Sequence, residues 1–469
     1  MKNNKYKRAI NMKKYILNKN YWTPILFLGI MVFSLLFTAC DNSDSNEGGG
    51  KITISKVFLE DVNSDVPDRE VTFARLGQLL RIEGSGFNGL KRVYINGYST
   101  YFNVVFVSDN SMLVSISADT PTTDADPEVR NTIRLANDNN EVIYSFEIRS
   151  AKPVIERISN TMPNAGETIT VYGSGLTEIN KVVFPGNIET TTGITSDEDG
   201  EFFTVTVPAG VSENGGSLFI QGANGGVYSP AYFNFKKGLL LNFDGQGNHG
   251  YWSTEDNPGM MRPTDLESTV IGVENVSQGK YVPHIPARIA SVDAGKGRAT
   301  ETWTDGNESW RTQLTPYIPA TTPLDKVAFQ FDIYVPEEWK DSGYLKICLI
   351  NNFSASQWTG GCYNYVPWLV DGKSVVFKTT GWTTVTIPFN KFYSYSTGDF
   401  TFEDVLVYRE TATYKNFGIW FENSNVKLSN VTGTASEVEF AAKATSVKVY
   451  TDNWRIVSLD TPIYDDFSN

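Results

Sequence analysis

Two stretches of the sequence combine indole and phenol rings with many hydroxyl, amide and carboxylate groups. They are Thr302–Arg311 (TWTDGNESWR) and Asn351–Trp368 (NNFSASQWTGGCYNYVPW). An aromatic face packs against the C–H groups of a sugar ring, while neighbouring polar groups bind the ring hydroxyls. The two stretches therefore predict a carbohydrate-binding site, and the rings expected to contact the ligand are Trp310, Trp358, Tyr363, Tyr365, Trp303 and Trp368.

The distribution of tryptophan favours the same prediction. Nine of the ten tryptophans follow residue 250, and the tenth is Trp22. If tryptophan served only to fill cores, the residues between 40 and 250 should contain some. Two of the nine, Trp382 and Trp454, lie in regular alternating runs and are expected to be core residues.

The elements that must position these rings are strands. Runs with a helical period are rare, whereas short alternating runs such as Leu80–Ile82 and Phe203–Val207 are typical of strands with one buried face. The sequence therefore predicts an all-β fold. A chain of 469 residues is too long for one core, so several domains are expected.

The chain repeats itself at an offset of 89 residues. The segment 77–87 (GQLLRIEGSGF) matches 166–176 (GETITVYGSGL), and 93–97 (VYING) matches 182–186 (VVFPG). Gly-Ser-Gly lets the backbone adopt conformations that other residues avoid, and the strand that follows ends in a tight turn. A period near 90 residues is too long for a solenoid and suits a small β-sandwich used twice.

Both copies resemble the IPT/TIG immunoglobulin-like family through the Gly-Ser-Gly motif and the strand after it. The resemblance implies immunoglobulin-like sandwiches at residues 51–150 and 151–237. A new apolar strand begins after Gly238, and residues 238–469, with short strands and turns, fit a larger jelly-roll-type β-sandwich. The tryptophans place the glycan-binding site in this C-terminal region.

The N-terminal 39 residues carry seven basic and no acidic side chains. Their apolar run, Pro24–Ala39, is shorter than the ~20 residues of a spanning helix, so residues 1–39 predict a secretory signal peptide. Leu36–Cys40 (LFTAC) resembles a bacterial lipobox, although Phe37 is bulkier than usual. The resemblance implies cleavage before Cys40 and acylation of its thiol; an ordinary signal peptide with a free Cys40 is the alternative.

Charge narrows the class of partner. Residues 40–50 read as a flexible acidic and glycine-rich linker, which resembles the surface-export signal of Bacteroidetes lipoproteins. Without residues 1–39, the chain has 33 basic and 53 acidic side chains, a net charge of −20. Such a chain repels nucleic acid and anionic polymers, so we expect no nucleic-acid partner and a neutral ligand.

Two further features leave alternatives open. The segments around Asp244 and Asp452 look like the paired start and end of carbohydrate-binding jelly rolls, where a structural Ca²⁺ can bind hard oxygens. We expect no required cofactor but a possible structural calcium at these two aspartates; solvated turn residues are the alternative. Cys348 and Cys362 could form a disulfide in an exported protein or remain buried free thiols.

The whole architecture resembles the surface glycan-binding proteins of Bacteroidetes polysaccharide-utilisation systems, in the SGBP-B or SusE/SusF-like position. The resemblance implies a non-catalytic lipoprotein on the outer membrane, facing the cell exterior. It would capture a polysaccharide beside a SusC/SusD-like transporter. A neutral, β-linked plant glycan is favoured: xyloglucan, mixed-linkage β-glucan or mannan.

Two rival functions are weaker. Immunoglobulin-like repeats also occur in adhesins that bind proteins, but an adhesin leaves the tryptophan distribution unexplained. A glycoside hydrolase needs two carboxylates across the scissile bond, and an acidic chain offers such pairs by chance. His249 and His284 lack zinc-ligand spacing, and the sequence contains no Gly-x-Ser-x-Gly motif.

Overall fold

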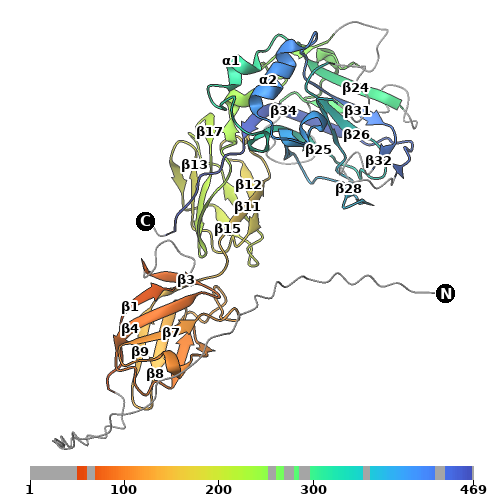
Figure 1. Ribbon diagram of the computed structural model, residues 1–469. Helices are drawn as coiled ribbons and strands as arrows, with labels where there is room; N and C mark the ends of the chain where they lie inside the picture. The colour runs from red at the N-terminus through yellow and green to blue at the C-terminus, as the bar shows by residue number, and fades with distance from the viewer. Residues whose placement is uncertain are drawn as a thin grey trace, which may run out of the picture. The chain divides into compact units, whose positions relative to one another are not determined.

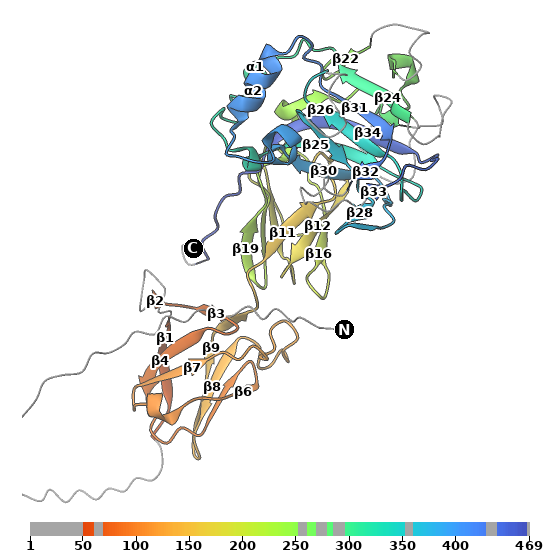
Figure 2. The same ribbon diagram turned by 45° about the vertical axis from the view of Figure 1, so that its right-hand side comes forward.

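A computed structural model describes residues 50–60, 69–251, 260–268, 279–284, 296–351, 360–427 and 439–466 (Figures 1 and 2). The predicted signal peptide, Cys40 and Trp358 lie outside these residues. Strands dominate the described chain and pair antiparallel, apart from the parallel pair of Phe73–Arg75 with Glu147–Arg149. This confirms the predicted all-β class with tandem immunoglobulin-like sandwiches. Across the same residues, the helices are too short or too polar to cross a bilayer.

The first sandwich contains strands β1 to β10. One sheet has the order β2-β1-β4-β7, another β6-β5-β8-β9, and β10 pairs with β3. The strands are β1 (Thr53–Leu59), β2 (Arg69–Glu70), β3 (Phe73–Arg75), β4 (Leu79–Ser85), β5 (Arg92–Ile95), β6 (Tyr98–Thr100), β7 (Ser111–Ser115), β8 (Thr132–Ala136), β9 (Glu141–Ser145) and β10 (Glu147–Arg149).

The second sandwich repeats this plan with strands β11 to β20. Its sheets are β11-β12-β16-β15, β14-β13-β18-β19 and the pair β17-β20. The strands are β11 (Val154–Ile158), β12 (Thr168–Ser174), β13 (Lys181–Phe184), β14 (Ile188–Thr190), β15 (Ile194–Ser196), β16 (Phe202–Thr206), β17 (Asn214–Gly216), β18 (Phe219–Gly222), β19 (Gly225–Tyr228) and β20 (Phe233–Phe235).

The two glycines of each Gly-Ser-Gly motif serve different purposes. Gly86 and Gly175 have positive φ angles, 75° and 67°, which only glycine adopts without strain. Gly84 and Gly173 instead lie against the carbonyl of the neighbouring strand, and a Cβ there would fall 1.9 Å or 1.8 Å from that oxygen. The motif therefore ends β4 and β12 at the same kind of bulged pairing with β1 and β11.

The C-terminal sandwich contains two five-stranded sheets. The first sheet has the strand order β21-β34-β25-β30, and β23 also pairs with β34. The second sheet has the order β22-β24-β31-β26-β27. The central strands of the second sheet run side by side in Figure 1. The elements are β21 (Leu239–Leu241), β22 (His249–Gly250), β23 (Val282–His284), β24 (Lys296–Thr304), α1 (Trp310–Leu314), β25 (Val327–Tyr334), β26 (Tyr344–Cys348), β27 (Cys362–Tyr365), β28 (Leu369–Val370), β29 (Lys373–Ser374), β30 (Thr383–Pro388), α2 (Phe402–Thr411), β31 (Gly418–Asn423), β32 (Val426–Lys427), β33 (Glu439–Phe440) and β34 (Val449–Ser458).

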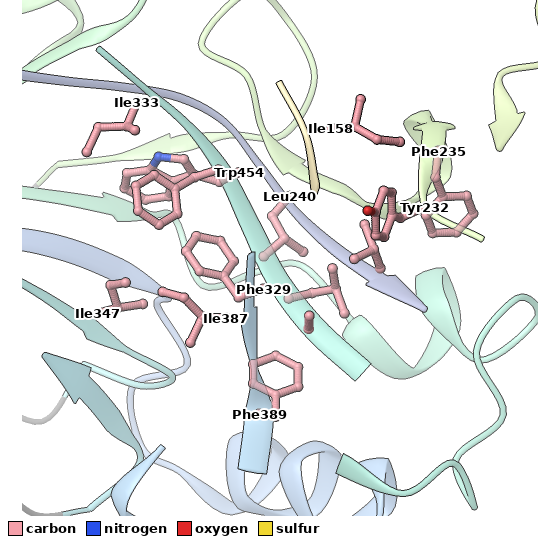
Figure 3. Packing of buried hydrophobic residues seen from close by; sticks show 14 of the residues in the cluster. Ile158, Tyr232, Phe235, Leu240, Phe329, Ile333, Ile347, Ile387, Phe389 and Trp454 are labelled. Atoms are coloured by element: carbon pink, nitrogen blue, oxygen red, sulfur yellow. The ribbon is translucent and has the colours of Figure 1, made fainter. Parts of the chain in front are cut away.

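One hydrophobic core is continuous from the second sandwich into the C-terminal sandwich. Figure 3 shows Tyr232 and Phe235 of the second sandwich near Leu240 and Phe329 of the C-terminal one. The first sandwich has a separate core. Apolar burial of this kind is the main favourable term in folding, so the second and C-terminal sandwiches stabilise each other.

A buried polar network crosses the same junction. Arg455 on β34 is fully buried and forms an ion pair with Asp332 on β25 (Nη2–Oδ1, 2.9 Å). Nη2 of Arg455 also donates to the hydroxyl of Thr161 in the second sandwich (2.8 Å). The Thr161 hydroxyl donates to the Gln330 side chain (3.1 Å). The backbone N–H of Thr161 donates to the Thr384 hydroxyl (3.1 Å). Buried charges are tolerated when paired and hydrogen-bonded, as here.

The Arg455 network gives the first prediction. Arg455→Ala leaves the Asp332 carboxylate buried without its cation, which costs about 3–5 kcal/mol of unfolding free energy. Urea unfolding followed by tryptophan fluorescence should show the loss, because Trp454 lies next to the deleted side chain. Arg92→Ala, at an exposed position on β5, is the control and should leave the transition unchanged. Equal midpoints for Arg455→Ala and the control would contradict the network's role.

Two histidines make stability depend on pH. His284 on β23 is completely buried between the Thr300 and Thr451 hydroxyls (Nδ1–Oγ1 3.1 Å, Nε2–Oγ1 2.9 Å), and burial lowers its pKa to about 3. Burial lowers the pKa of His249 to about 4. In the unfolded chain these histidines titrate near the ordinary pKa of ~6.5. Below that pH the unfolded chain therefore binds protons that the folded chain does not. The free energy of unfolding falls as the pH drops from about 6.5 toward 3.

Replacing His284 with Gln, which cannot titrate, should remove its share of this loss. Between pH 7.5 and pH 5 the expected difference is about 2 kcal/mol of unfolding free energy. Urea titrations at both pH values measure it. If wild type and His284→Gln lose the same stability on acidification, the buried neutral histidine is not responsible.

Candidate functional site

A cavity of about 490 Å³ lies beside the two helices of the C-terminal sandwich; we call it the Tyr414 cavity. It is built from the second half of the first predicted stretch together with α2 and the segment after it. Its lining residues are Asp305, Gly306, Asn307, Glu308, Ser309, Trp310, Arg311, Leu406, Arg409, Glu410, Thr413, Tyr414, Lys415 and Asn416.

The two walls of the Tyr414 cavity are tied together where β24 ends and β31 begins. Thr304, the last residue of β24, accepts at its carbonyl from the Asn416 side chain (2.8 Å), and its hydroxyl accepts from the Phe417 N–H (3.0 Å). Gly306 then turns the chain with a φ of 79°. Ser309 caps α1 by accepting from the Thr312 N–H (3.2 Å).

Charged side chains join α1 to α2, which lie together in both views (Figures 1 and 2). Arg311 forms ion pairs with Glu403 (2.7 Å) and Glu410 (2.8 Å). Arg409 is buried, lies over the Trp310 ring (3.8 Å to its centroid) and donates to Glu308 (2.9 Å). Burial lowers the pKa of Arg409 to about 10, and Glu308 opposes that shift. The base of the cavity is therefore an ordered set of paired charges.

Tyr414 is the exposed aromatic residue of this cavity. Its side chain is 64% exposed, and its carbonyl accepts from the Asn351 N–H (3.3 Å), where the second predicted stretch begins. An exposed ring among amide, hydroxyl and carboxylate groups is the arrangement that binds sugar rings. Tyr414 was not among the predicted rings, because the prediction was confined to the two stretches rich in tryptophan. The capping box that starts α2, in which the Thr401 N–H donates to Asp404 (2.8 Å), would have marked the helix before Tyr414.

Three of the predicted rings are not on the surface, which corrects the sequence analysis. Trp303 and Trp368 are 0% exposed, and Trp310 is 3% exposed. Trp303 donates to Glu301 (3.2 Å), and Trp368 donates to the Gly343 carbonyl (2.7 Å). Their rings pack into cores, so they cannot offer a face to a sugar in this conformation. Trp310 still lines the Tyr414 cavity, where Arg409 covers one face of its ring.

The remaining predicted rings are Tyr363, Tyr365 and Trp358, and none of them lines the Tyr414 cavity among the described residues. Tyr363 and Tyr365 are half-buried on β27, and both pack against the main core. Burial raises the pKa of each. Tyr365 lines a second cavity, apart from the Tyr414 cavity. Trp358 lies outside the described residues. The structure thus does not bring the five described rings of the prediction together.

Trp382 and Trp454, the two tryptophans predicted to be core residues, differ in burial. Trp454 is completely buried, as predicted for a core residue. Trp382 is only half-buried and lines the same second cavity as Tyr365, so the expectation that it is a core residue was too simple.

The two aspartates of the calcium prediction lie in one electrostatic environment. The pKa of buried Asp452 is raised well above its usual range by burial, with Asp332 and Asp244 adding to the shift. Both oxygens of Asp244 accept from the Lys280 N–H (2.9 Å). Within the described ranges no group of three or more His, Cys, Asp or Glu could hold a metal ion. Calcium takes about six to eight oxygens, more than two carboxylates supply. The calcium site at Asp244 and Asp452 stays a prediction.

Cys348 and Cys362 are buried and keep their thiols, with no disulfide between them. They lie directly opposite each other on β26 and β27. Burial raises the pKa of the Cys348 thiol, and its contact with Cys362 adds to the shift. The structure therefore favours the free-thiol alternative.

Comparisons with known proteins give this cavity its context. Residues 233–458 match the family model described as the surface glycan-binding protein B xyloglucan binding domain. This region is therefore similar to that domain. The match supports the resemblance to surface glycan-binding proteins with IPT/TIG domains.

Individual relatives agree. An IPT/TIG domain-containing protein of Bacteroides ovatus is 24% identical over 319 residues, which span 67% of this chain and 54% of that relative. The crystal structure of a surface glycan-binding protein, PbSGBP-B from Prevotella bryantii, has a TM-score of 0.60 and 18% identity, covering 88% of this chain and 99% of its own. An SGBP-B of Bacteroides uniformis from a complex xyloglucan utilization locus has a TM-score of 0.44 and 16% identity. The match covers 87% of this chain and 100% of that structure. At 18% identity, the likeness to PbSGBP-B shows the fold alone.

Proposed function

We propose that this chain is a non-catalytic lipoprotein of the cell surface that captures a neutral, β-linked plant glycan, with xyloglucan as the first candidate. The observation that carries the proposal is the family match over residues 233–458. The glycan is bound in the C-terminal sandwich and is passed to a SusC/SusD-like transporter. The net charge of −20 after residue 39 supports a neutral ligand over an anionic one.

The Tyr414 cavity is the proposed contact with the glycan. Tyr414 stacks against one face of a sugar ring, and Asn307, Ser309 and Thr413 exchange hydrogen bonds with its hydroxyls; all four side chains are exposed. The ion pairs of Arg311 with Glu403 and Glu410 hold the wall behind them. Open sites of this kind gain on the order of 1 kcal/mol per stacked ring beyond area burial.

Affinity electrophoresis tests binding and its location together. Residues 41–469 are run in native gels containing xyloglucan, mixed-linkage β-glucan, galactomannan or pectin. We expect retardation by xyloglucan and none by pectin. Tyr414→Ala should weaken binding about fivefold to tenfold, the equivalent of about 1 kcal/mol or slightly more.

Tyr317→Ala is the matched control, because Tyr317 is also exposed (44%) in the C-terminal sandwich but does not line the cavity. It should migrate as wild type. Retardation that survives Tyr414→Ala would leave glycan capture standing and move the site elsewhere. Absence of retardation by every glycan, or release of new reducing ends, would overturn the proposal.

The proposed lipid anchor gives a separate prediction. In cells fed an alkyne-labelled fatty acid, the wild-type chain should carry the label and sediment with outer membranes. Cys40→Ala removes the only thiol that the lipobox resemblance assigns to acylation, so label and membrane association should both be lost. Cys348→Ala is the control and should keep both. Labelling that persists in Cys40→Ala would exclude Cys40 as the anchor.

A further inference from the structure

A larger cavity, of about 660 Å³, lies where β12 of the second sandwich meets the segment Phe377–Val385 of the C-terminal sandwich. We call it the Trp382 cavity. Its volume is within the range of about 300–1,000 Å³ typical of small-molecule sites. Its two walls are held together by the hydrogen bond from the Thr384 N–H to the Ser159 carbonyl (2.8 Å) and by the Arg455 network behind it. The cavity is therefore a fixed feature of the junction.

Trp382 supplies the aromatic wall. Of the seven tryptophans in the described chain, six are at most 4% exposed, and Trp382 is the exception. Its ring contacts Tyr281 edge-to-face (centroids 5.3 Å apart) and Tyr334 (5.9 Å). These contacts fix the ring before any ligand arrives, which lowers the entropy cost of stacking. The tryptophan that remains accessible thus lines the larger of the two cavities.

Arg157 and Tyr172 form the opposite wall. The Arg157 guanidinium lies over the Tyr172 ring, 3.4 Å from its centroid. The side chain of Arg157 is exposed and, within the described ranges, has no hydrogen-bond acceptor or ion-pair partner. Guanidinium groups present several N–H donors in one plane, a geometry that suits the oxygens of neighbouring hydroxyls on a sugar ring.

The first sandwich shows that this pair is not a requirement of the repeat. Arg157 pairs with Tyr172 across β11 and β12, and the positions with the same register in β1 and β4 are Lys56 and Glu83. Lys56 forms an exposed ion pair with Glu70 (3.0 Å). The fold therefore accepts a carboxylate, Glu83, where the second sandwich has the aromatic ring of Tyr172 beneath the cation that lines the cavity.

Part of the polar lining makes no hydrogen bond within the described residues. Thr168, Thr170 and Thr380 line the cavity, and their hydroxyls make no hydrogen bond to any described residue. Each hydroxyl can both donate and accept, as the hydroxyls of a sugar can. The one buried carboxylate of the lining, Glu167, already accepts from Asn164 and Asn160. What remains available to a ligand is these hydroxyls together with two exposed cations, Arg157 and Lys378, which can donate to the oxygens of a sugar.

We propose that the Trp382 cavity is a second carbohydrate-binding site, which takes a short neutral run of sugar residues. Trp382 stacks on one ring, and Arg157 donates to neighbouring hydroxyl oxygens of that ring or the next. The assignment of a carbohydrate as the ligand rests on the proposed function. The location of the site rests on the lining of the Trp382 cavity alone. Two sites on one chain would raise the affinity for a long polysaccharide above that for a short oligosaccharide, because the second contact becomes intramolecular.

Isothermal titration calorimetry of residues 41–469 with a xyloglucan-derived oligosaccharide tests this inference. Wild type should bind two oligosaccharides per chain. Arg157→Ala and Trp382→Ala should each weaken one site about tenfold or more and leave a stoichiometry near one. Arg157 is exposed, so its variant stays folded even if Trp382→Ala does not. Lys56→Ala, at the equivalent position of the first sandwich, is the control and should bind as wild type.

The outcomes separate the two proposals. A wild-type stoichiometry of one that neither Arg157→Ala nor Trp382→Ala affects, with Tyr414→Ala reducing affinity, would overturn the second site and leave the proposed function intact. One remaining site in Tyr414→Ala that Arg157→Ala then abolishes would support the second site. Binding at this cavity of uronic-acid oligosaccharides alone would overturn the neutral-ligand assignment. No heat with any glycan would overturn both proposals.

Discussion

The buried ion pair between Arg455 and Asp332 is the constraint on which the functional half of the chain depends. Neither charge could remain buried alone, and the network that satisfies them includes Thr161 from the second sandwich. The second sandwich is therefore part of the folded environment of β25 and β34. The continuous apolar core adds to the same effect. An immunoglobulin-like repeat that serves only as a spacer would need neither. In this chain the second repeat instead forms one wall of a cavity.

The aromatic residues divide into two groups with different physical roles. Trp303, Trp368 and Trp454 are completely buried, and the N–H of each has a partner inside the protein. They provide the large apolar area that a two-sheet sandwich needs, and their hydrogen bonds fix them in place. Tyr414 and Trp382 keep part of their rings accessible and lie beside polar side chains. The proposed carbohydrate capture uses the second group, while the first group stabilises the sandwich that carries it.

The sequence was sufficient for the fold because the fold depends on local rules. Alternating residues and Gly-Ser-Gly motifs recur wherever a strand must end against its neighbour, as Gly84 and Gly173 do. It was insufficient for the site because accessibility is a tertiary property. Trp310 lies in a polar loop-like stretch yet is covered by Arg409, which is distant in sequence. Trp382 lies in a regular alternating run, directly before β30, yet remains half-exposed, because the facing wall comes from β12. Neither the Arg409–Trp310 contact nor the wall opposite Trp382 can be predicted from residue type and spacing.

Hydrogen–deuterium exchange of residues 41–469, with and without a saturating xyloglucan oligosaccharide, would test the central claim most directly. The account places glycan capture on the C-terminal sandwich, at the cavity between α1, α2 and the start of β31. It therefore predicts slower exchange in the presence of the oligosaccharide at backbone amides within residues 305–311 and 409–416. Residues 69–149 of the first sandwich should exchange at the same rate in both samples. Protection confined to the first sandwich, or no protection anywhere at saturation, would contradict the account.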